Sequence, residues 1–259
     1  MLRISTHYLH SAIRGHRTAF ENFTDGDFEA VYLSAVLITL ISTFLMSASD
    51  SLDESTAPFD ESMWLRLAVG PRELVPVWKT LIQDEHPLTI TGALREGPDL
   101  SDDAEVFRLE YGRPFDVLLR WATEFDYVSE DDSEAYQHTV SYVGLIYKVI
   151  NEASEPPLAT SRRLIAFPAR APPRFLDLAL EKRPRALVIL AHVVAMMKIL
   201  AHSIPWYVGI AEKHIPVIES RLPSGWKPVM QWPMAVLHTI DGRGAPLPVP
   251  PNIDEVSPR

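Results

Sequence analysis

The sequence predicts an all-α protein, a single irregular bundle of helices with a central buried helix near residues 185–203. Apolar side chains recur at helical spacing in several segments. Residues 186–197 carry no charge, which suits a helix in the middle of a core. No segment alternates apolar and polar residues between hairpin turns, so no strand is predicted. Hydrophobic residues make up 47% of the 259 residues, enough to build a sizeable core.

The N-terminal part predicts a pair of helices. Apolar residues in the segment 9–20 recur at helical spacing, so we expect an amphipathic helix that ends near Asn22. Thr24 and Asp27 then offer side-chain oxygens to the first amides of the next helix. This second helix is predicted to begin near Phe28.

The second helix is nearly long enough to cross a bilayer. Residues 30–48 carry no charge, close to the roughly 20 residues that a membrane span requires. However, Asp27 and Glu29 precede the run, Asp50 and Asp53 follow it, and neither end shows the Lys/Arg bias of a span. We therefore expect a buried central helix, with a membrane span as the alternative. Hydroxyl side chains form one strip along its second half: Thr39, Ser42, Thr43 and Ser47.

Loops and short helices are expected to alternate in the middle of the chain. Acidic residues, Pro and Gly predict loops over 49–62 and 86–103. Short helices are predicted over 63–69 and 73–83, separated by Gly70 and Pro71.

Two amphipathic helices are predicted next, around residues 115–122 and 136–147. Each has acidic residues in its first turn, which suits the positive end of the helix dipole. Pro156 and Pro157 are expected to end the second of them.

Prolines set the helix boundaries in the C-terminal third. Pro173 opens a helix through Lys182, and Pro184 lies at the first turn of the uncharged helix, which Pro205 ends.

A helical stretch over 206–222, bent at Pro216, and a last helix around 226–237 follow the uncharged helix. We predict one all-α domain over residues 1–241 and a Pro-rich flexible tail over residues 242–259.

Charge and cysteine content exclude several classes of function. The net charge of -10 repels polyphosphate, so direct nucleic-acid binding is not expected. The absence of cysteine excludes disulfides, thiolate nucleophiles and cysteine-based zinc or iron–sulfur sites within these residues. It also suits a reducing, intracellular compartment. Residues 1–17 lack the apolar core of a secretory signal, and none is expected.

Three blocks of sequence resemble a known family. Residues 173–198 read PRFLDLALEKRPRALVILAHVVAMMK, a short helix, an Arg-Pro break and a long apolar helix containing Ala-His. Two tryptophan-bearing segments, IPWYVGIAEKHI and GWKPVMQWPMAVL, follow, and an N-terminal helix pair, HRTAFENFTDGDFEAVYLSAVLITLISTF, precedes. Together they resemble the carboxy-terminal regulatory domain of fungal six-cysteine zinc-cluster transcription factors, especially the sterol uptake control proteins, over residues 9–237.

The resemblance implies a ligand-sensing regulatory domain rather than an enzyme, without a cofactor. In the sterol-responsive members, a hydrophobic pocket holds a sterol that controls nuclear entry and activation. The expected partners are therefore a sterol or other lipophilic ligand, and a second copy or a transcriptional co-regulator, in the nucleus or shuttling to it. One departure is large: the zinc cluster needs six cysteines, and this chain has none. It is a stand-alone domain, a gene fragment or a descendant put to another use.

A sterol requires a dry, apolar cavity with one or two polar groups at its end. Met, Trp and Tyr suit such a lining, because Met adapts to irregular shapes and Trp and Tyr combine apolar area with a polar atom. The alternative is that these residues are simply core, and that the histidine bonds a neighbouring group. The candidate pocket residues are His192, which would bond the hydroxyl, with Met196, Met197, Leu200, Trp206 and Tyr207.

Catalytic and metal chemistry find little support. No HExxH pattern occurs, and His192 and His202 are too far apart for one helical turn. No GxSxG elbow is present. The acidic run at residues 130–132 is interpreted as a solvated helix start, and the basic neighbourhood over 162–185 as a solvated face. The alternative to a regulatory domain is a repurposed all-α enzyme or binding protein that recognises a lipophilic metabolite by shape.

Overall fold

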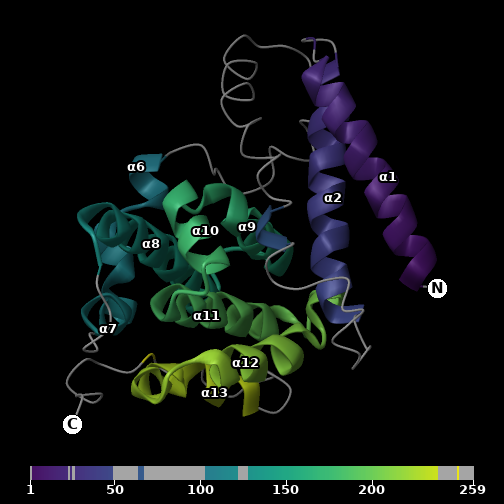
Figure 1. The fold of residues 1–259 in the computed structure, drawn as a ribbon. Coiled ribbons are helices and arrows are strands. Elements are labelled where there is room, and N and C mark those ends of the chain that lie inside the picture. Colours follow the sequence, from purple (N-terminus) through teal and green to yellow (C-terminus); the bar gives the residue numbers. More distant parts are fainter. Residues whose placement is uncertain are drawn as a thin grey trace. The chain divides into compact units, whose positions relative to one another are not determined.

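The computed structural model describes residues 2–22, 24, 27–48, 64–66, 103–121, 128–238 and 250. Within these ranges the chain forms helices and turns and no strand, which confirms the all-α prediction (Figure 1). The chain divides into two units, one of residues 1–101 with 168–170 and one of residues 102–167 with 171–259. The predicted boundary between residues 241 and 242 lies outside the described residues and stays a prediction.

The first unit contains the predicted helix pair. Helix α1 runs over Leu2–Glu21 and α2 over Phe28–Ala48, side by side and antiparallel (Figure 1). In the connection, the Thr24 hydroxyl donates to the Asp27 carboxylate at 2.6 Å. The His16 ring joins the helices through a 2.7 Å hydrogen bond between its Nδ1 and the Ser34 hydroxyl. Both predicted boundaries, near Asn22 and near Phe28, are therefore confirmed.

The prediction that α2 is buried on all sides is wrong. One face of α2 is buried, and its hydroxyl groups donate to carbonyls of the same helix, as Thr39 does to Ala35 at 2.9 Å. The opposite face exposes bulky apolar side chains, with Leu37 54% and Ile41 41% exposed. Hydroxyls that donate to carbonyls of their own helix need no other partner and can therefore be buried. The buried face of α2 thus includes its hydroxyl strip, and the lack of charge along the helix did not show which face is buried.

Part of the predicted middle segment is described. Residues 64–66 are helical, inside the predicted helix over 63–69, and Trp64 and Leu65 are buried. The rest of that helix, the helix over 73–83 and the loop over 49–62 lie outside the described residues.

The second unit is a bundle of α-helices and short 3-10 helices. Its elements, in chain order, are α6 Asp103–Val106, η2 Leu109–Phe115, α7 Asp116–Arg120, α8 Glu130–Glu152, α9 Pro157–Arg170 (up to residue 167), α10 Pro173–Leu180, α11 Pro184–Leu200, η3 Pro205–Tyr207, α12 Ile210–Arg221, η4 Ser224–Met230 and α13 Gln231–His238.

Helix α11 forms the centre of the second unit. It lies between α8 and α10 on one side and α12 and α13 on the other (Figure 1). All residues of 185–197 are buried, which confirms the predicted central helix. The helix ends at Leu200 and not at Pro205, because the Leu200 carbonyl accepts the amides of Ser203 and Ile204 in a tight turn. Pro205 itself disfavours helical backbone at the residue before it.

Helix α9 was not predicted from the sequence. Pro157, expected only to end the preceding helix, occupies the first turn of α9, where its missing N–H costs nothing.

The backbones of α8 and η2 approach each other closely at Gly144. A Cβ on Gly144 of α8 would lie 1.8 Å from the Tyr111 carbonyl oxygen of η2. Only glycine allows this contact between the two backbones.

Candidate functional site

The ring of His192 packs in a cluster with three other aromatic rings, and the four rings come from four different elements. Phe115 of η2, Tyr147 of α8, His192 of α11 and Trp232 of α13 form what we term the aromatic box. His192 stacks on Trp232 with ring centroids 5.3 Å apart and planes 9° apart. Phe115 meets His192 edge-on at 5.4 Å, and Tyr147 meets Trp232 edge-on at 5.9 Å. All four residues are buried, so the box is a desolvated part of the core.

One ring nitrogen of His192 has no hydrogen-bond partner. His192 is 0% exposed, and its Nδ1 lies 2.8 Å from the Val188 carbonyl oxygen one turn earlier in α11. Since a carbonyl only accepts, Nδ1 carries the proton and Nε2 presents a lone pair. Nε2 is buried without a partner. An unpaired buried acceptor of this kind costs roughly 1–3 kcal/mol.

His192 is neutral at physiological pH. Burial lowers the pKa of its imidazole to about 4, and the weaker opposing effect of the Val188 carbonyl does not reverse this. A neutral imidazole in an apolar environment suits a ligand that donates one hydrogen bond and is otherwise apolar. It does not suit an anionic ligand, which would need a positive partner.

The other predicted pocket residues are divided between two surroundings. Met196, Met197 and Leu200 are buried on α11, and Met196 lies one turn from His192 on the same face. Tyr207, at 0% exposure, instead bonds Ser161 of α9. Trp206 is half-buried beside Tyr207, with ring centroids 6.3 Å apart. A pocket formed by all six residues stays a prediction.

The Tyr207 hydroxyl makes its hydrogen bonds with a single residue, Ser161. Its hydroxyl donates to the Ser161 carbonyl at 3.1 Å and lies 3.0 Å from the Ser161 hydroxyl. Burial raises the pKa of the phenol well above its ordinary value. Both groups are therefore neutral, and each uses its hydrogen-bonding capacity within the core.

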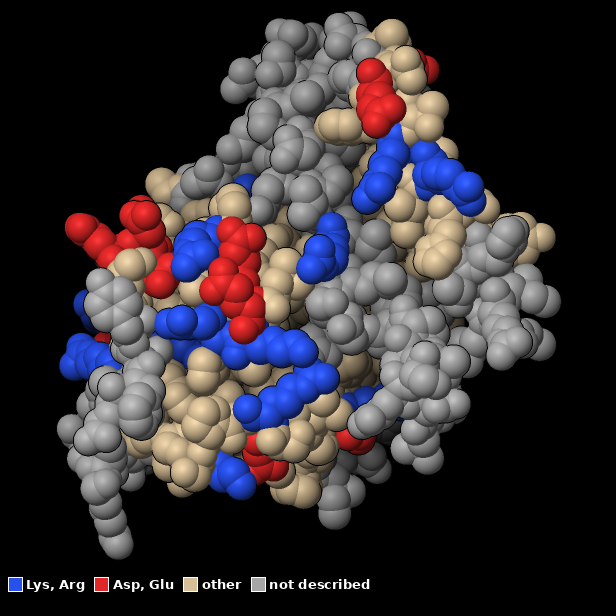
Figure 2. Space-filling model, in the orientation of Figure 1, with Lys and Arg blue, Asp and Glu red and all other residues tan. Residues whose placement is uncertain are grey.

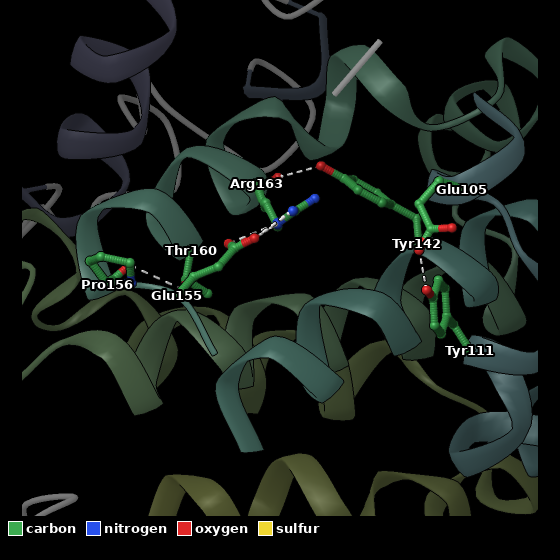
Figure 3. Close-up of polar contacts among 7 residues, drawn as sticks. All are labelled: Glu105, Tyr111, Tyr142, Glu155, Pro156, Thr160 and Arg163. Carbon is green, nitrogen blue, oxygen red and sulfur yellow. Dashed lines mark hydrogen bonds and ion pairs between the residues drawn. The ribbon is translucent and has the colours of Figure 1, made fainter. Parts of the chain in front are cut away.

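Part of the basic neighbourhood predicted as a solvated face is buried. Arg163 is 8% exposed and binds Glu155 through both Nη2, at 2.6 Å, and Nε, at 3.0 Å (Figure 3). The Tyr142 hydroxyl donates to the Arg163 carbonyl at 2.9 Å (Figure 3). This network ties α8 to α9. A second pair in the same view joins the Tyr111 phenol to Glu105.

Arg185 is the second correction to that prediction. It is 4% exposed, and its guanidinium donates to the carbonyls of Leu118 and Trp121, each at 2.5 Å, at the end of α7. It also lies over the rings of Tyr136 and Trp226, at 5.5 and 5.4 Å. Arg185 therefore satisfies helix-end carbonyls from the first turn of α11.

The acidic helix start is also only partly solvated. Glu130 and Asp131 are exposed as predicted, but Asp132 is 5% exposed and binds Arg174 of α10 at 2.6 Å. Burial alone would raise the pKa of the Asp132 carboxyl. The hydrogen bonds from Arg174 and Ser129 and the charge of Arg174 outweigh burial, so the pKa lies below its ordinary value.

The remaining surface charges are mixed in sign. On the face drawn in Figure 2, Lys and Arg side chains lie next to Asp and Glu side chains. Exposed pairs such as Arg120 with Asp116, 3.1 Å apart, are examples of this mixing. In the described part of the chain, no group of three or more His, Asp or Glu is placed to hold a metal ion. No described helix has both the length and the hydropathy needed to cross a bilayer.

Comparison with known proteins gives two distant relatives. The Zn(2)-C6 fungal-type transcription factor afumD of Aspergillus fumigatus is 27% identical over 195 residues, covering 73% of this chain and 48% of that protein. A Zn(2)-C6 fungal-type transcription factor of Gibberella zeae is 28% identical over 116 residues, covering 44% of this chain and 21% of that protein. The chain is distantly similar to fungal Zn(2)-C6 transcription factors.

This similarity has clear bounds. No family model matches the chain, and no solved structure matches it. The chain spans about half the length of the Aspergillus relative. Its 259 residues contain no cysteine, so they form no zinc cluster of their own. Both relatives are named as transcription factors and not as enzymes, and neither name refers to a sterol. The resemblance to sterol uptake control proteins therefore stays a prediction.

Proposed function

We propose that this chain is a regulatory, ligand-sensing domain of the fungal transcription factor type, acting in the nucleus and not as an enzyme. Its ligand is a lipophilic alcohol, with a sterol as the first candidate. Support comes from the distant similarity to two Zn(2)-C6 transcription factors. These 259 residues contain no cysteine, so zinc-dependent DNA binding through a six-cysteine cluster is not part of the proposed role.

The observation that carries the proposal is the Nε2 atom of His192, which is buried without a hydrogen-bond partner inside the aromatic box. A hydroxyl that donates to Nε2 would satisfy this atom, while the apolar body of the ligand would contact Met196 and the aromatic rings. The ligand would then bind the folded state alone and stabilise it by mass action.

The experiment compares ergosterol with a sterane of the same ring system that lacks the hydroxyl. At about 100 times its Kd, a ligand that binds only the folded state adds about 2.7 kcal/mol of stability. For a chain of this size that raises the Tm by roughly 5 °C. We expect this shift with ergosterol and a smaller one with the sterane.

Two histidine variants form a matched pair. His192→Leu removes the acceptor and should abolish the preference for ergosterol over the sterane. His202→Leu is the control, because His202 also places Nδ1 2.8 Å from a carbonyl, of Ile199, but is exposed. It should leave the preference unchanged. Equal shifts with both ligands, or none with either at saturation, would reject the proposed ligand class.

A further inference from the structure

The aromatic box is closed around His192. Both His192 and Phe115 are 0% exposed, Trp232 is 2% exposed, and Tyr147, the most exposed of the four, reaches 8%. Protein interiors are close-packed, and the space next to a buried side chain is filled by its neighbours. A ligand can therefore reach Nε2 of His192 only if one wall of the box moves.

Two of the four walls are joined to each other by backbone contact. Phe115 ends η2 and Tyr147 lies on α8, and these two elements meet at Gly144. A Cβ on Gly144 would lie 1.8 Å from the Tyr111 carbonyl oxygen, so no side chain separates the two backbones. Tyr147 follows Gly144 by less than one helical turn. We therefore expect the backbones of Phe115 and Tyr147 to keep their relative positions.

The third wall is α11, which contains His192. All residues of 185–197 are buried, with α8 and α10 on one side of the helix and α12 and α13 on the other. At the start of α11, the Arg185 guanidinium donates to the carbonyls of Leu118 and Trp121. Displacing α11 would expose apolar side chains on all its sides and break these hydrogen bonds. Helix α11 is therefore a poor candidate for the wall that moves.

The fourth wall, α13, is short and buries one face. It has 8 residues, of which Trp232, Pro233 and Val236 are buried, whereas Gln231 and His238 are exposed. The cost of moving a helix grows with the apolar surface that it exposes to water. Displacing α13 therefore costs less than displacing α11.

Trp232 is the side chain through which α13 closes the box. Its ring lies nearly parallel to the His192 ring, with centroids 5.3 Å apart. It also meets Phe115 edge-on at 5.7 Å and Tyr147 edge-on at 5.9 Å. An apolar ligand bound next to His192 would contact the same ring faces and edges. The ligand and the Trp232 ring therefore compete for one place.

On the basis of the ligand proposed for His192, we propose that α13 is the wall of the aromatic box that moves when the ligand binds. The Trp232 ring covers His192 in the closed form and gives way to the ligand in the open form. A ligand that binds the open form better shifts the population toward it. Helix α13 thus transmits ligand binding from the buried box to the surface, where Gln231 and His238 are exposed.

Spin labels measure this movement, because the 259 residues contain no cysteine and introduced cysteines are unique. Gln231→Cys on α13 and Glu152→Cys on α8 form the test pair, at exposed positions. Arg113→Cys on η2 with Glu152→Cys is the control pair, because η2 and α8 are in backbone contact. By electron paramagnetic resonance, saturating ergosterol should change the mean distance of the test pair by about 4 Å, the separation of two carbon layers in contact. The control distance should stay within about 1 Å.

The outcomes separate the movement from the ligand. If ergosterol raises the Tm but leaves the test distance unchanged, the movement of α13 is overturned and the ligand class stands. If the control distance changes as much as the test distance, η2 and α8 move as well, and α13 is not the moving wall. Neither a Tm shift nor a distance change at saturation would reject both the ligand and the movement.

Association rates provide a second measurement. Trp232→Leu removes the ring that has to give way, so ergosterol should associate at least about tenfold faster, as expected if the open form is a minor state of the unmodified chain. Phe175→Leu is the control, because Phe175 is 0% exposed and its ring contacts are with Tyr136 and Phe167, outside the box. The control rate should stay within about twofold. An unchanged rate in Trp232→Leu would contradict the displacement of the ring. Circular dichroism checks folding, and if Trp232→Leu does not fold, the spin-label distances decide, because those labels leave the box intact.

Discussion

Helices α2 and α11 share the lack of charge along most of their length and differ in their surroundings. Both contain a long uncharged run, over 30–48 in α2 and 186–197 in α11. Every residue from 185 to 197 in α11 is buried. In α2, Leu37 and Ile41 are about half exposed, while Thr39 and its neighbouring hydroxyls are buried. Absence of charge therefore predicts that at least one face of a helix is buried, but it does not predict how many faces are.

The two helices also begin differently. Helix α11 starts with Arg185, whose guanidinium is buried against carbonyls at the end of α7 and the rings of Tyr136 and Trp226. Helix α2 starts with an exposed bond between Thr24 and Asp27. The start of α11 is thus held by polar contacts over a long sequence distance, whereas the bond that precedes α2 is local.

The largest expected effect tests this anchor. Arg185→Ala leaves buried carbonyls of Leu118 and Trp121 without their donor, and should lower the free energy of unfolding by about 4 kcal/mol. Arg120→Ala is the control, because the Arg120 side chain is 65% exposed in its pair with Asp116. That substitution should cost about 0–1 kcal/mol. Urea denaturation measures both, and equal losses would show that Arg185 is no anchor.

The next effect tests the comparison of burial directly. Leu190 of α11 is 2% exposed and Leu37 of α2 is 54% exposed. Leu190→Ala should therefore lower the free energy of unfolding by about 3 kcal/mol, through lost burial and a residual cavity. Leu37→Ala should cost less than about 1 kcal/mol. If the two losses are the same in thermal and urea unfolding, the outward face of α2 is covered in solution.

Local patterns in the sequence predicted most of the fold. The ends of α1 and α2 followed from periodicity and from Thr24, and the central position of α11 followed from its uncharged run. Helix α9 was not predicted, since Pro157 is as good a first residue as it is a stop signal. A helix boundary predicted from proline is ambiguous in this way, because proline can end one helix and can equally occupy the first turn of the next.

Contacts over long sequence distances were beyond such patterns. Arg163 and Arg185 belong to a run of basic residues that resembles any solvated face, and only the bundle brings Glu155 and the end of α7 to them. Trp121 likewise donates to the Gly225 carbonyl 104 residues away. His192 was identified as a buried polar residue from its apolar helix. That its stacking partner is Trp232 required the packing of α13 on α11.

The smallest expected effect concerns pH, and it again separates the two helices. The buried polar groups of α2 described above are hydroxyls, which do not ionise in the acid range, whereas α11 buries His192, whose pKa burial lowers to about 4. Because the unfolded chain binds a proton below about 6.5 and the folded chain does not, stability is fully present above pH 6.5 and is lost toward pH 4. Between pH 7 and pH 5 the loss should be about 2 kcal/mol. Urea unfolding of the unmodified chain and of His192→Phe at pH 7 and pH 5 isolates the contribution of the imidazole, since the Asp132–Arg174 pair is common to both proteins. A pH dependence that persists unchanged in His192→Phe would show that the imidazole is already protonated or solvated, and that α11, like α2, has a side open to water.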